Sequence, residues 1–563
     1  MSEIPPETAR IEELTSFLYG SRGAEVAEAL IHIADRYCAD RSRRTRRRWT
    51  GRDAILITYA DSIREEGVAP VRTLDAVLAA LAPEITGVHL LPFFPWTSDD
   101  GFSVSDFGAV DPAVGTWDDI AALGSRTELM VDAVINHVSV SSAWFQGFLA
   151  GDPDFAEWFI SVPPETDLSK VVRPRTLPLL TEFETARGPE SIWTTFSADQ
   201  VDLNYASPEV LLAVVEVLLD YAARGATLIR LDAVGFLWKE FGTACIHHPK
   251  THAIIQLIRT IFDVVDPAVS LITETNVPHG ENISYFGDGS NEAQLVYNFA
   301  LPPLVLHSFV SGSANELTRW ASGLATPSSD TTFFNFLASH DGIGLRGVED
   351  ILSPADIDAL AARARAHDGL VAYRSAAGAQ PKPYELNINY FDALSHPDGR
   401  DPVEAQVARF VTAHAILLSL PGVPGIYVHS LLGSRGWPEG VRRSGADRSI
   451  NRERLERSEL EQELADETGR RARVLSAIRR LLRARAGHAA FDPHAASAVL
   501  DLGHPGLFAI ERSADGRVVR CVHNVSAESV SVPGGPWTDL LTDEVFVGVL
   551  QAWESRWLIP VSQ

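Results

Sequence analysis

The regular alternation of short apolar segments with helical segments constrains the fold of this chain most. The apolar segments are rich in Val, Ile and Leu, as expected of strands buried in a parallel sheet. They occupy residues 54–61, 87–94, 128–136, 226–234, 269–276, 293–299, 332–341 and 422–430. Helical patterns lie between them at 71–81, 116–124, 208–224, 249–265 and 403–419. Eight such units predict an α/β fold, a closed (β/α)₈ TIM barrel with its chemistry at the C-terminal strand ends.

The remaining segments predict the domain organisation. Residues 1–50 have helical spacing and indicate a helical N-terminal extension. Residues 138–205 and 345–400 read as irregular and exceed ordinary loop length, so we expect an insertion subdomain after strand three and a second lid insertion before strand eight. Residues 489–563 alternate in polarity between turn residues, which predicts a C-terminal antiparallel β domain. The catalytic barrel then comprises 51–137 and 206–488.

Composition narrows the classes of partner. The net charge of −26 leaves no excess of cations for phosphate backbones, so nucleic acid is not expected. The chain has three scattered Cys, an acidic N-terminus without an apolar core, and no run of about 18 apolar residues, which predicts a soluble, cytoplasmic protein without membrane contact. The basic run at 41–48 is expected to be a solvated face, with an RNA or regulatory contact as the alternative. Homo-oligomer formation is left open.

The predicted strand at 227–236 contains charged residues near its end. Arg230 and Asp232 share one face of it, and burying a charge is costly unless the charge is paired. A structural ion pair is one interpretation. Other strands also end in polar residues, namely Asp61, Asp132, Asn136, His137, Glu274, His340 and Asp341. Three acidic strand ends suit glycosidic bond cleavage, which needs an acid and a second carboxylate; a metal site is the rival, which the nearby Arg230 disfavours.

Four strand ends together resemble the motifs of the α-amylase superfamily, in the same order and spacing. They are DAVINH (132–137), RLDAV (230–234), ETN (274–276) and ASHD (338–341). Further segments look like the sucrose-phosphorylase branch, among them DDGFSV (99–104), SHDGIG (339–344), LPGVPGIY (420–427) and SINR (449–452). The resemblance covers about 54–490, and the C-terminal domain more weakly.

The resemblance implies a retaining double displacement without a cofactor or a catalytic metal. Asp232 would be the nucleophile, Glu274 the general acid/base, and Asp341 would hold sugar hydroxyls. Arg230 would keep Asp232 ionised by lowering its pKa. The other residues implied in substrate binding are Asp99, Phe102, His137, His340 and Arg452, with core filling as the alternative role for Phe102. A non-catalytic binding protein or an α-glucosidase are rival interpretations.

Departures from sucrose phosphorylases point to the acceptor. Phe236 stands where a Tyr is common, Glu385 lies in the second lid, and six Arg follow the last strand between 435 and 454. The Arg-rich loop, the N-terminal extension and residues 274–287 look more like the glucosylglycerate phosphorylases of this branch. We therefore expect transfer between an α-glucoside and inorganic phosphate, giving glucose 1-phosphate. Sucrose, sucrose 6-phosphate and glucosylglycerol phosphorylases are the close rivals. Candidate phosphate or acceptor cations are Arg173, Arg175, Arg435 and Arg448; Glu385 would contact acceptor hydroxyls or hold one of these Arg.

Overall fold

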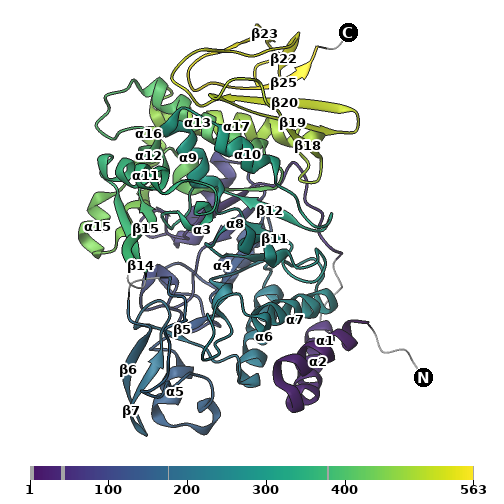
Figure 1. The fold of residues 1–563 in the computed structure, drawn as a ribbon, viewed down its shortest axis with the longest axis vertical. Helices are drawn as coiled ribbons and strands as arrows, with labels where there is room; N and C mark the ends of the chain where they lie inside the picture. Colours follow the sequence, from purple (N-terminus) through teal and green to yellow (C-terminus); the bar gives the residue numbers. More distant parts are fainter. Residues whose placement is uncertain (1–5, 40–44, 175–176, 377–378, 562–563) are drawn as a thin grey trace.

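The computed structural model describes residues 6–39, 45–174, 177–376 and 379–561, and its centre is a closed barrel of eight parallel strands (Figure 1). In order around the barrel the strands are β1 (Ile55–Thr58), β16 (Val423–Tyr427), β12 (Thr332–Asn335), β11 (Leu295–Tyr297), β10 (Ser270–Thr273), β9 (Leu228–Leu231), β4 (Glu128–Ala133) and β3 (Gly87–Leu90). Each lies inside one of the eight predicted segments, so the predicted TIM barrel is confirmed.

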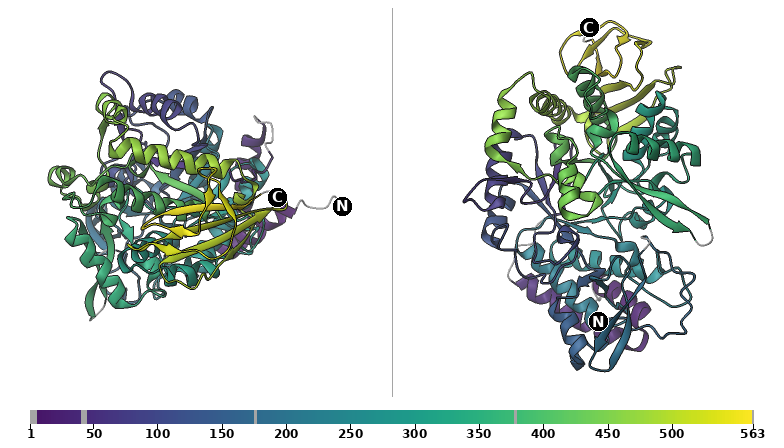
Figure 2. Two further views of the ribbon diagram at one scale, coloured as in Figure 1. Left: turned by 90° about the horizontal axis from the view of Figure 1, so that it is seen from above. Right: turned by 90° about the vertical axis from the view of Figure 1, so that its left-hand side faces the viewer.

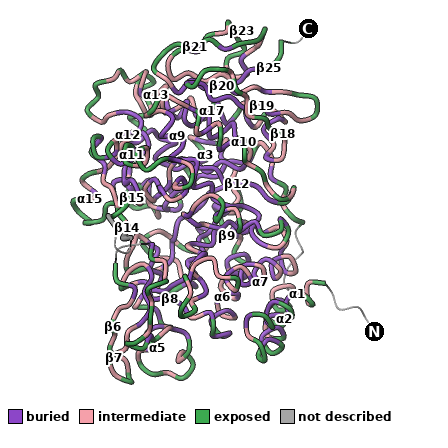
Figure 3. The backbone as a smooth tube through the Cα atoms, viewed as in Figure 1, coloured by how far each residue is buried: buried purple, intermediate pink, exposed green. Residues whose placement is uncertain are grey.

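The strands are short, apolar and buried on both faces, as Figure 3 shows for the centre of the molecule. Pairing in register aligns their ends. In β9, Arg230 lies opposite Asp132 of β4 and Ile272 of β10. The residues that follow β9, β10 and β4 therefore emerge at one end of the barrel, which is the end where barrel enzymes carry their sites.

Amphipathic helices surround the strands, and the five predicted ones end close to their predicted bounds. These are α3 (Pro70–Leu81), α4 (Trp117–Gly124), α6 (Pro208–Ala223), α7 (Pro249–Val265) and α13 (Val403–Ser419). A further helix, α17 (Arg470–Ala486), packs against α13. Pro at the first turn begins α3, α6 and α7, where its missing N–H costs nothing. Thr116 and Asp119 form a capping box at the start of α4.

Both insertions contain regular structure, so the expectation of irregular segments there is wrong. The first holds the hairpin β6 (Leu180–Thr185) and β7 (Gly188–Trp193), the helix α5 (Ala143–Ala150), and the pair β5 (His137–Ser139) with β8 (Gln200–Asp202). The second holds α11 (Pro354–Ala366) and a sheet in the order β13 (Ile343–Gly344), β15 (Ala379–Asn387), β14 (Leu370–Ala376). The strands of both hairpins are partly exposed, so they lack the apolar pattern of buried strands.

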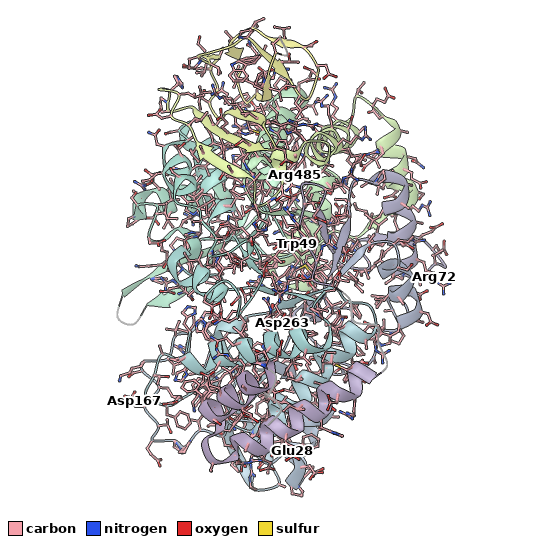
Figure 4. The ribbon with its side chains drawn as sticks, turned by 90° about the vertical axis from the view of Figure 1, so that its right-hand side faces the viewer. Glu28, Trp49, Arg72, Asp167, Asp263 and Arg485 are labelled. Carbon is pink, nitrogen blue, oxygen red and sulfur yellow. The ribbon has the colours of Figure 1, made fainter. Side chains whose placement is uncertain are left out.

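Two N-terminal helices, α1 (Pro6–Tyr19) and α2 (Gly23–Ala39), pack against α6 and α7. In the described part of the basic run Arg46 and Arg48 are exposed, in line with the expected solvated face, but Arg46 and Arg47 are also ion-paired to the barrel. Arg46 pairs with Asp263 and Asp330, and Arg47 pairs with Asp53 and Glu128. Figure 4 labels Asp263 and also Trp49, over whose ring the Arg47 guanidinium lies at 4.4 Å. Arg41, Arg43 and Arg44 lie outside the described residues.

The C-terminal segment forms a six-stranded antiparallel sheet, as predicted, at the end of the molecule opposite the N-terminal helices (Figure 2). Its order is β18 (Ala496–Val499), β19 (Leu507–Ala514), β20 (Arg517–Asn524), β25 (Ser555–Pro560), β22 (Trp537–Asp539), β23 (Val545–Phe546). Beneath it the buried Arg485 (labelled in Figure 4) donates to the carbonyls of Gly51, Asp53 and Gly422. Within the described ranges, no helix has the length and apolarity needed to span a membrane.

Candidate active site

A pocket opens at the C-terminal ends of the barrel strands and collects the three predicted catalytic carboxylates. Asp232 follows β9, Glu274 follows β10, and Asp341 lies in the loop beyond β12. The cavity has an empty volume of ≈740 Å³, which includes the open solvent at its mouth. The strand ends predicted from the sequence therefore form one site.

Arg230 links the carboxylates at the floor of the pocket. Its Nη1 lies 2.8 Å from Asp232 Oδ1 and also contacts Asp132, and its Nη2 lies 3.9 Å from Glu274 Oε2. Ala233, with φ 47°, turns the chain sharply after Asp232, so that its backbone N–H donates to Glu274 Oε2 at 3.0 Å. A positive φ at a residue with a Cβ is uncommon and holds the two carboxyls in a fixed relation.

The pKa values of Asp232 and Glu274 are both raised, and the two groups titrate as a pair. Burial is the main cause for each, and Arg230 opposes it. The expectation that Arg230 lowers the pKa of Asp232 counted only the cation, whereas the loss of hydration outweighs it. Arg230 lies closer to Asp232 than to Glu274, so it stabilises the Asp232 carboxylate more strongly than that of Glu274.

Asp341 is stabilised as an anion. Burial alone would raise its pKa, yet the pKa lies below the ordinary range because the guanidinium groups of Arg448, Arg452 and Arg230 stabilise the charged form. Arg448 Nη1 lies 2.6 Å from Asp341 Oδ1. Burial lowers the pKa of His340 to about 3, so its ring is neutral at physiological pH.

One wall of the pocket has the mixed character of a sugar-binding surface. Phe102 lines it and stacks on His340, with ring centroids 4.8 Å apart. His137 Nε2 lies 2.8 Å from the Phe102 carbonyl and 3.1 Å from Gln200 Nε2. Asp99 also lines the pocket, at a positive φ of 54°. An apolar ring face beside polar groups matches the surfaces of a hexose.

The buried Glu385 and the partly buried Arg448 form an ion pair beside Asp341. Arg448 donates from Nε at 3.0 Å and from Nη2 at 2.7 Å to the two carboxylate oxygens of Glu385. Glu385 is buried in β15 and does not itself line the pocket within the described chain, whereas Arg448 does. Of the two roles considered for Glu385, the geometry selects the holding of an Arg.

Three other predicted cations are placed differently from the expectation. Arg452 does not line the pocket as described; it pairs with Asp100, and its Nε donates to the His340 carbonyl at 2.9 Å. Arg435 contacts Asp392 and Gln406 and stacks over Phe391, which takes it out of the pocket wall. Arg173 is exposed, although the next residue, Pro174, lines the pocket. Arg175 lies outside the described residues.

Sequence reasoning missed several pocket residues. They are Phe196, Gln200, His247, Asn276, Tyr384 and Arg346. Tyr384 precedes the predicted Glu385, and Asn276 is the last residue of the ETN motif, so both lie next to residues that the sequence singles out. Arg346 and His247 carried no local signal, because their approach depends on how the second lid and the loop after β9 fold.

The candidate metal ligands do not gather into a metal site. Asp132 is held by Arg230 and by His89 Nε2 at 2.8 Å. Across the described part of the chain, no group of three or more His, Cys, Asp or Glu side chains is arranged to hold a metal ion. The carboxyl groups at the pocket floor instead surround the guanidinium of Arg230.

Comparisons with known proteins agree with this geometry. Residues 82–342 match the family model described as the α-amylase catalytic domain. The chain is 49% identical to a glucosylglycerate phosphorylase of Allomeiothermus silvanus, over 99% of this chain and 100% of that protein. It is 33% identical to a sucrose phosphorylase of Agrobacterium vitis, over 78% of this chain and 88% of that protein.

A solved structure shares the fold. The sucrose 6F-phosphate phosphorylase from Thermoanaerobacter thermosaccharolyticum superposes with a TM-score of 0.73 at 24% identity, over 84% of this chain and 94% of that one. With the identities above and the acid pair at the strand ends, these findings show that the chain is an enzyme that belongs to the glycoside phosphorylases of the α-amylase family.

Proposed function

We propose that this enzyme transfers glucose from 2-O-α-glucosyl-D-glycerate to inorganic phosphate, giving α-glucose 1-phosphate and D-glycerate. The observation that carries the chemistry is the pair of buried carboxyl groups, Asp232 and Glu274, that Arg230 faces at the floor of the pocket. The choice of glycerate is supported by the relative of 49% identity over nearly the whole chain, which is a glucosylglycerate phosphorylase. Phosphate and glycerate are both small anions, so one subsite can accept them in turn.

In the first step, Asp232 attacks the anomeric carbon as the C–O bond to glycerate breaks. Glu274 gives its proton to the departing oxygen, which leaves as the glycerate hydroxyl. The product is a β-glucosyl ester of Asp232. Arg230 stabilises the Asp232 carboxylate before attack, and Asp341 holds sugar hydroxyls by hydrogen bonds that strengthen in the transition state.

In the second step, a phosphate oxygen attacks the same carbon and the ester bond breaks. Glu274, now a carboxylate, takes the proton from the attacking P–OH group, which restores both carboxyls to their starting states. Two inversions give net retention and therefore the α-anomer of glucose 1-phosphate. The route uses only residues of this chain, so we expect activity to survive a chelator.

The remaining members of the site would bind the glucosyl unit. Phe102 offers its ring face, and His137, His340 and Asp99 offer polar atoms to hydroxyls. Arg452 acts one step away: it fixes the loop of Asp99 through Asp100 and the loop of Asp341 through the His340 carbonyl.

An acceptor screen tests this assignment. With glucose 1-phosphate as donor, phosphate release is measured with glycerate, glycerol, fructose and fructose 6-phosphate. We expect the highest kcat/KM with D-glycerate. A clearly higher value with fructose 6-phosphate or glycerol would overturn the glycerate assignment and leave the phosphorylase chemistry intact, whereas glucose release that ignores phosphate would identify a hydrolase.

A further inference from the structure

The wall of the pocket away from the sugar-binding surface contains a fixed cation, Arg346. It follows β13, which pairs with β15 so that Gly344 lies opposite Glu385. The next residue, Leu345, donates from its backbone to the Tyr384 carbonyl at 2.9 Å. Gly347 is pressed against the backbone of Phe299, where an added Cβ would lie 2.8 Å from the carbonyl carbon. The backbone on both sides of Arg346 is therefore held, and its side chain lines the pocket.

Arg346 differs from the other Arg residues of the pocket in having no acid to pair with. Arg230 pairs with Asp232, and Arg448 is committed to Asp341 and Glu385. Arg346 is partly buried, and among the described residues its buried Nε has no hydrogen-bond partner and no acid is found in an ion pair with it. A partly buried guanidinium without a carboxylate is a favourable site for an anionic ligand, which would supply the charge-assisted hydrogen bonds that the protein does not.

His247 lies beside this cation in a strained loop. It has φ 53°, its backbone N–H donates to the Gly235 carbonyl at 3.0 Å, and Cys245 two residues earlier also has a positive φ. The ring is fixed by Tyr285 at 2.7 Å and by Glu281 at 3.2 Å. Burial and the charge of Arg346 both lower the pKa of His247, so the ring adds a neutral polar surface next to the cation.

Asn276 supplies an acceptor in the same pocket. Its Oδ1 is buried without a hydrogen-bond partner, and its amide lies against Gly344, where an added Cβ would be 2.4 Å from Nδ2. A guanidinium that lacks an anion and an amide oxygen that lacks a donor line the same cavity. A small molecule that carries both a carboxylate and a hydroxyl could bind the guanidinium with the first and donate to the amide oxygen with the second.

We propose that Arg346 is the anion-binding residue of the acceptor subsite, where it binds the carboxylate of a small hydroxy acid and, in the other half-reaction, phosphate. This inference deepens the proposed function and rests on it for the order of the two steps. Arg448, which the sequence favoured, would instead position Asp341, because its guanidinium is already held by two carboxylates.

The test compares acceptors for one and the same glucosyl-enzyme. α-Glucosyl fluoride is the donor, so that the intermediate forms without an anionic leaving group that needs this subsite. Glycerate, phosphate and glycerol compete with water for the intermediate, and NMR measures the product ratios. In Arg346→Gln we expect the glycerate-to-glycerol and phosphate-to-glycerol ratios to fall by about 10- to 100-fold, the effect of losing charge-assisted hydrogen bonds. Fluoride release into water should stay near the wild-type rate.

Matched variants make the outcome specific. Arg443→Gln removes an exposed Arg whose one ion pair among the described residues is with Glu439 on its own helix, and should leave all ratios unchanged. Arg346→Lys keeps the charge without the planar fork, so its ratios should lie between those of Arg346→Gln and wild type. Unchanged ratios in Arg346→Gln, or equal losses for glycerol and the two anions, would overturn the proposal.

The same data separate this inference from the proposed function. If the wild-type enzyme does not use glycerate but uses phosphate and another anion in a way that depends on Arg346, the glycerate assignment is wrong and the role of Arg346 is supported. If wild type uses glycerate and phosphate with ratios that ignore Arg346, the role of Arg346 falls and the proposed function stands. A wild-type intermediate that transfers only to water and glycerol would overturn both.

Discussion

Replacing Arg230 with Lys should move the acidic limb of the pH–activity profile upward. Arg230 contacts Asp132 and Asp232 with one nitrogen and faces Glu274 with another, and it is almost fully buried. A Lys ammonium is a single point charge on a shorter side chain, so it cannot contact all three carboxyl groups at once. The Asp232 carboxylate then loses stabilisation, so its pKa rises and a higher pH is needed to ionise the nucleophile.

The magnitude follows from the ion-pair distance. At an effective dielectric constant of about 20, unit charges 2.8 Å apart attract by about 6 kcal/mol, equivalent to about four pKa units. This is an upper bound, because the Lys keeps a charge in the same cavity. We expect a shift of at least about one unit, with a loss in kcat/KM at neutral pH of about 10-fold or more.

The assay is fluoride release from α-glucosyl fluoride across pH 4–8, since this donor needs no acid and its acidic limb reports the nucleophile. Arg259→Lys is the matched control: Arg259 is equally buried, pairs with Asp263 on α7, and does not line the pocket. It should leave the limb in place. An unmoved acidic limb in a folded Arg230→Lys enzyme would refute the idea that Arg230 sets the ionisation of Asp232.

Two further predictions follow from the site. Asp232→Ala should lose nearly all transfer activity. Glu274→Gln should lose about 10²- to 10⁴-fold in activity with glucosylglycerate, yet keep rapid fluoride release in the first turnover with α-glucosyl fluoride, measured by stopped flow. Equal losses of activity on both donors would contradict an acid role for Glu274. Arg435→Ala should lower the urea midpoint of unfolding, because Asp392 is left buried without its ion-pair partner. The KM values for phosphate and glycerate should stay unchanged. A large rise in either KM would show that Arg435 contributes to acceptor binding after all.

The barrel could be predicted because its signals are local. Each strand is a short apolar run and each helix has an apolar face, so eight units were visible in order. The hairpin β6–β7 and the strands β14 and β15 were not predicted, because they are partly exposed. β6 pairs with β7 and β14 pairs with β15, rather than with the barrel. Their partners lie in the lids, where no periodic burial marks a strand.

The site divides in the same way. Asp232, Glu274 and Asp341 were identified because each ends a strand or follows one within a recognisable motif. Arg435 and Arg448 looked alike in the sequence, and their difference comes from distant partners: Asp392 holds the first, while Asp341 and Glu385 hold the second. Arg346 was missed because its direction is set by the pairing of β13 with β15, which the sequence did not reveal.

The central claim is that glucose passes to phosphate through a covalent intermediate with retention. The most direct measurement is a time course by ¹H and ³¹P NMR of the enzyme with 2-O-α-glucosyl-D-glycerate and phosphate. The account predicts α-glucose 1-phosphate as the first sugar product, formed in step with free glycerate and only when phosphate is present. Initial formation of β-glucose 1-phosphate, or of free glucose at a rate independent of phosphate, would contradict it.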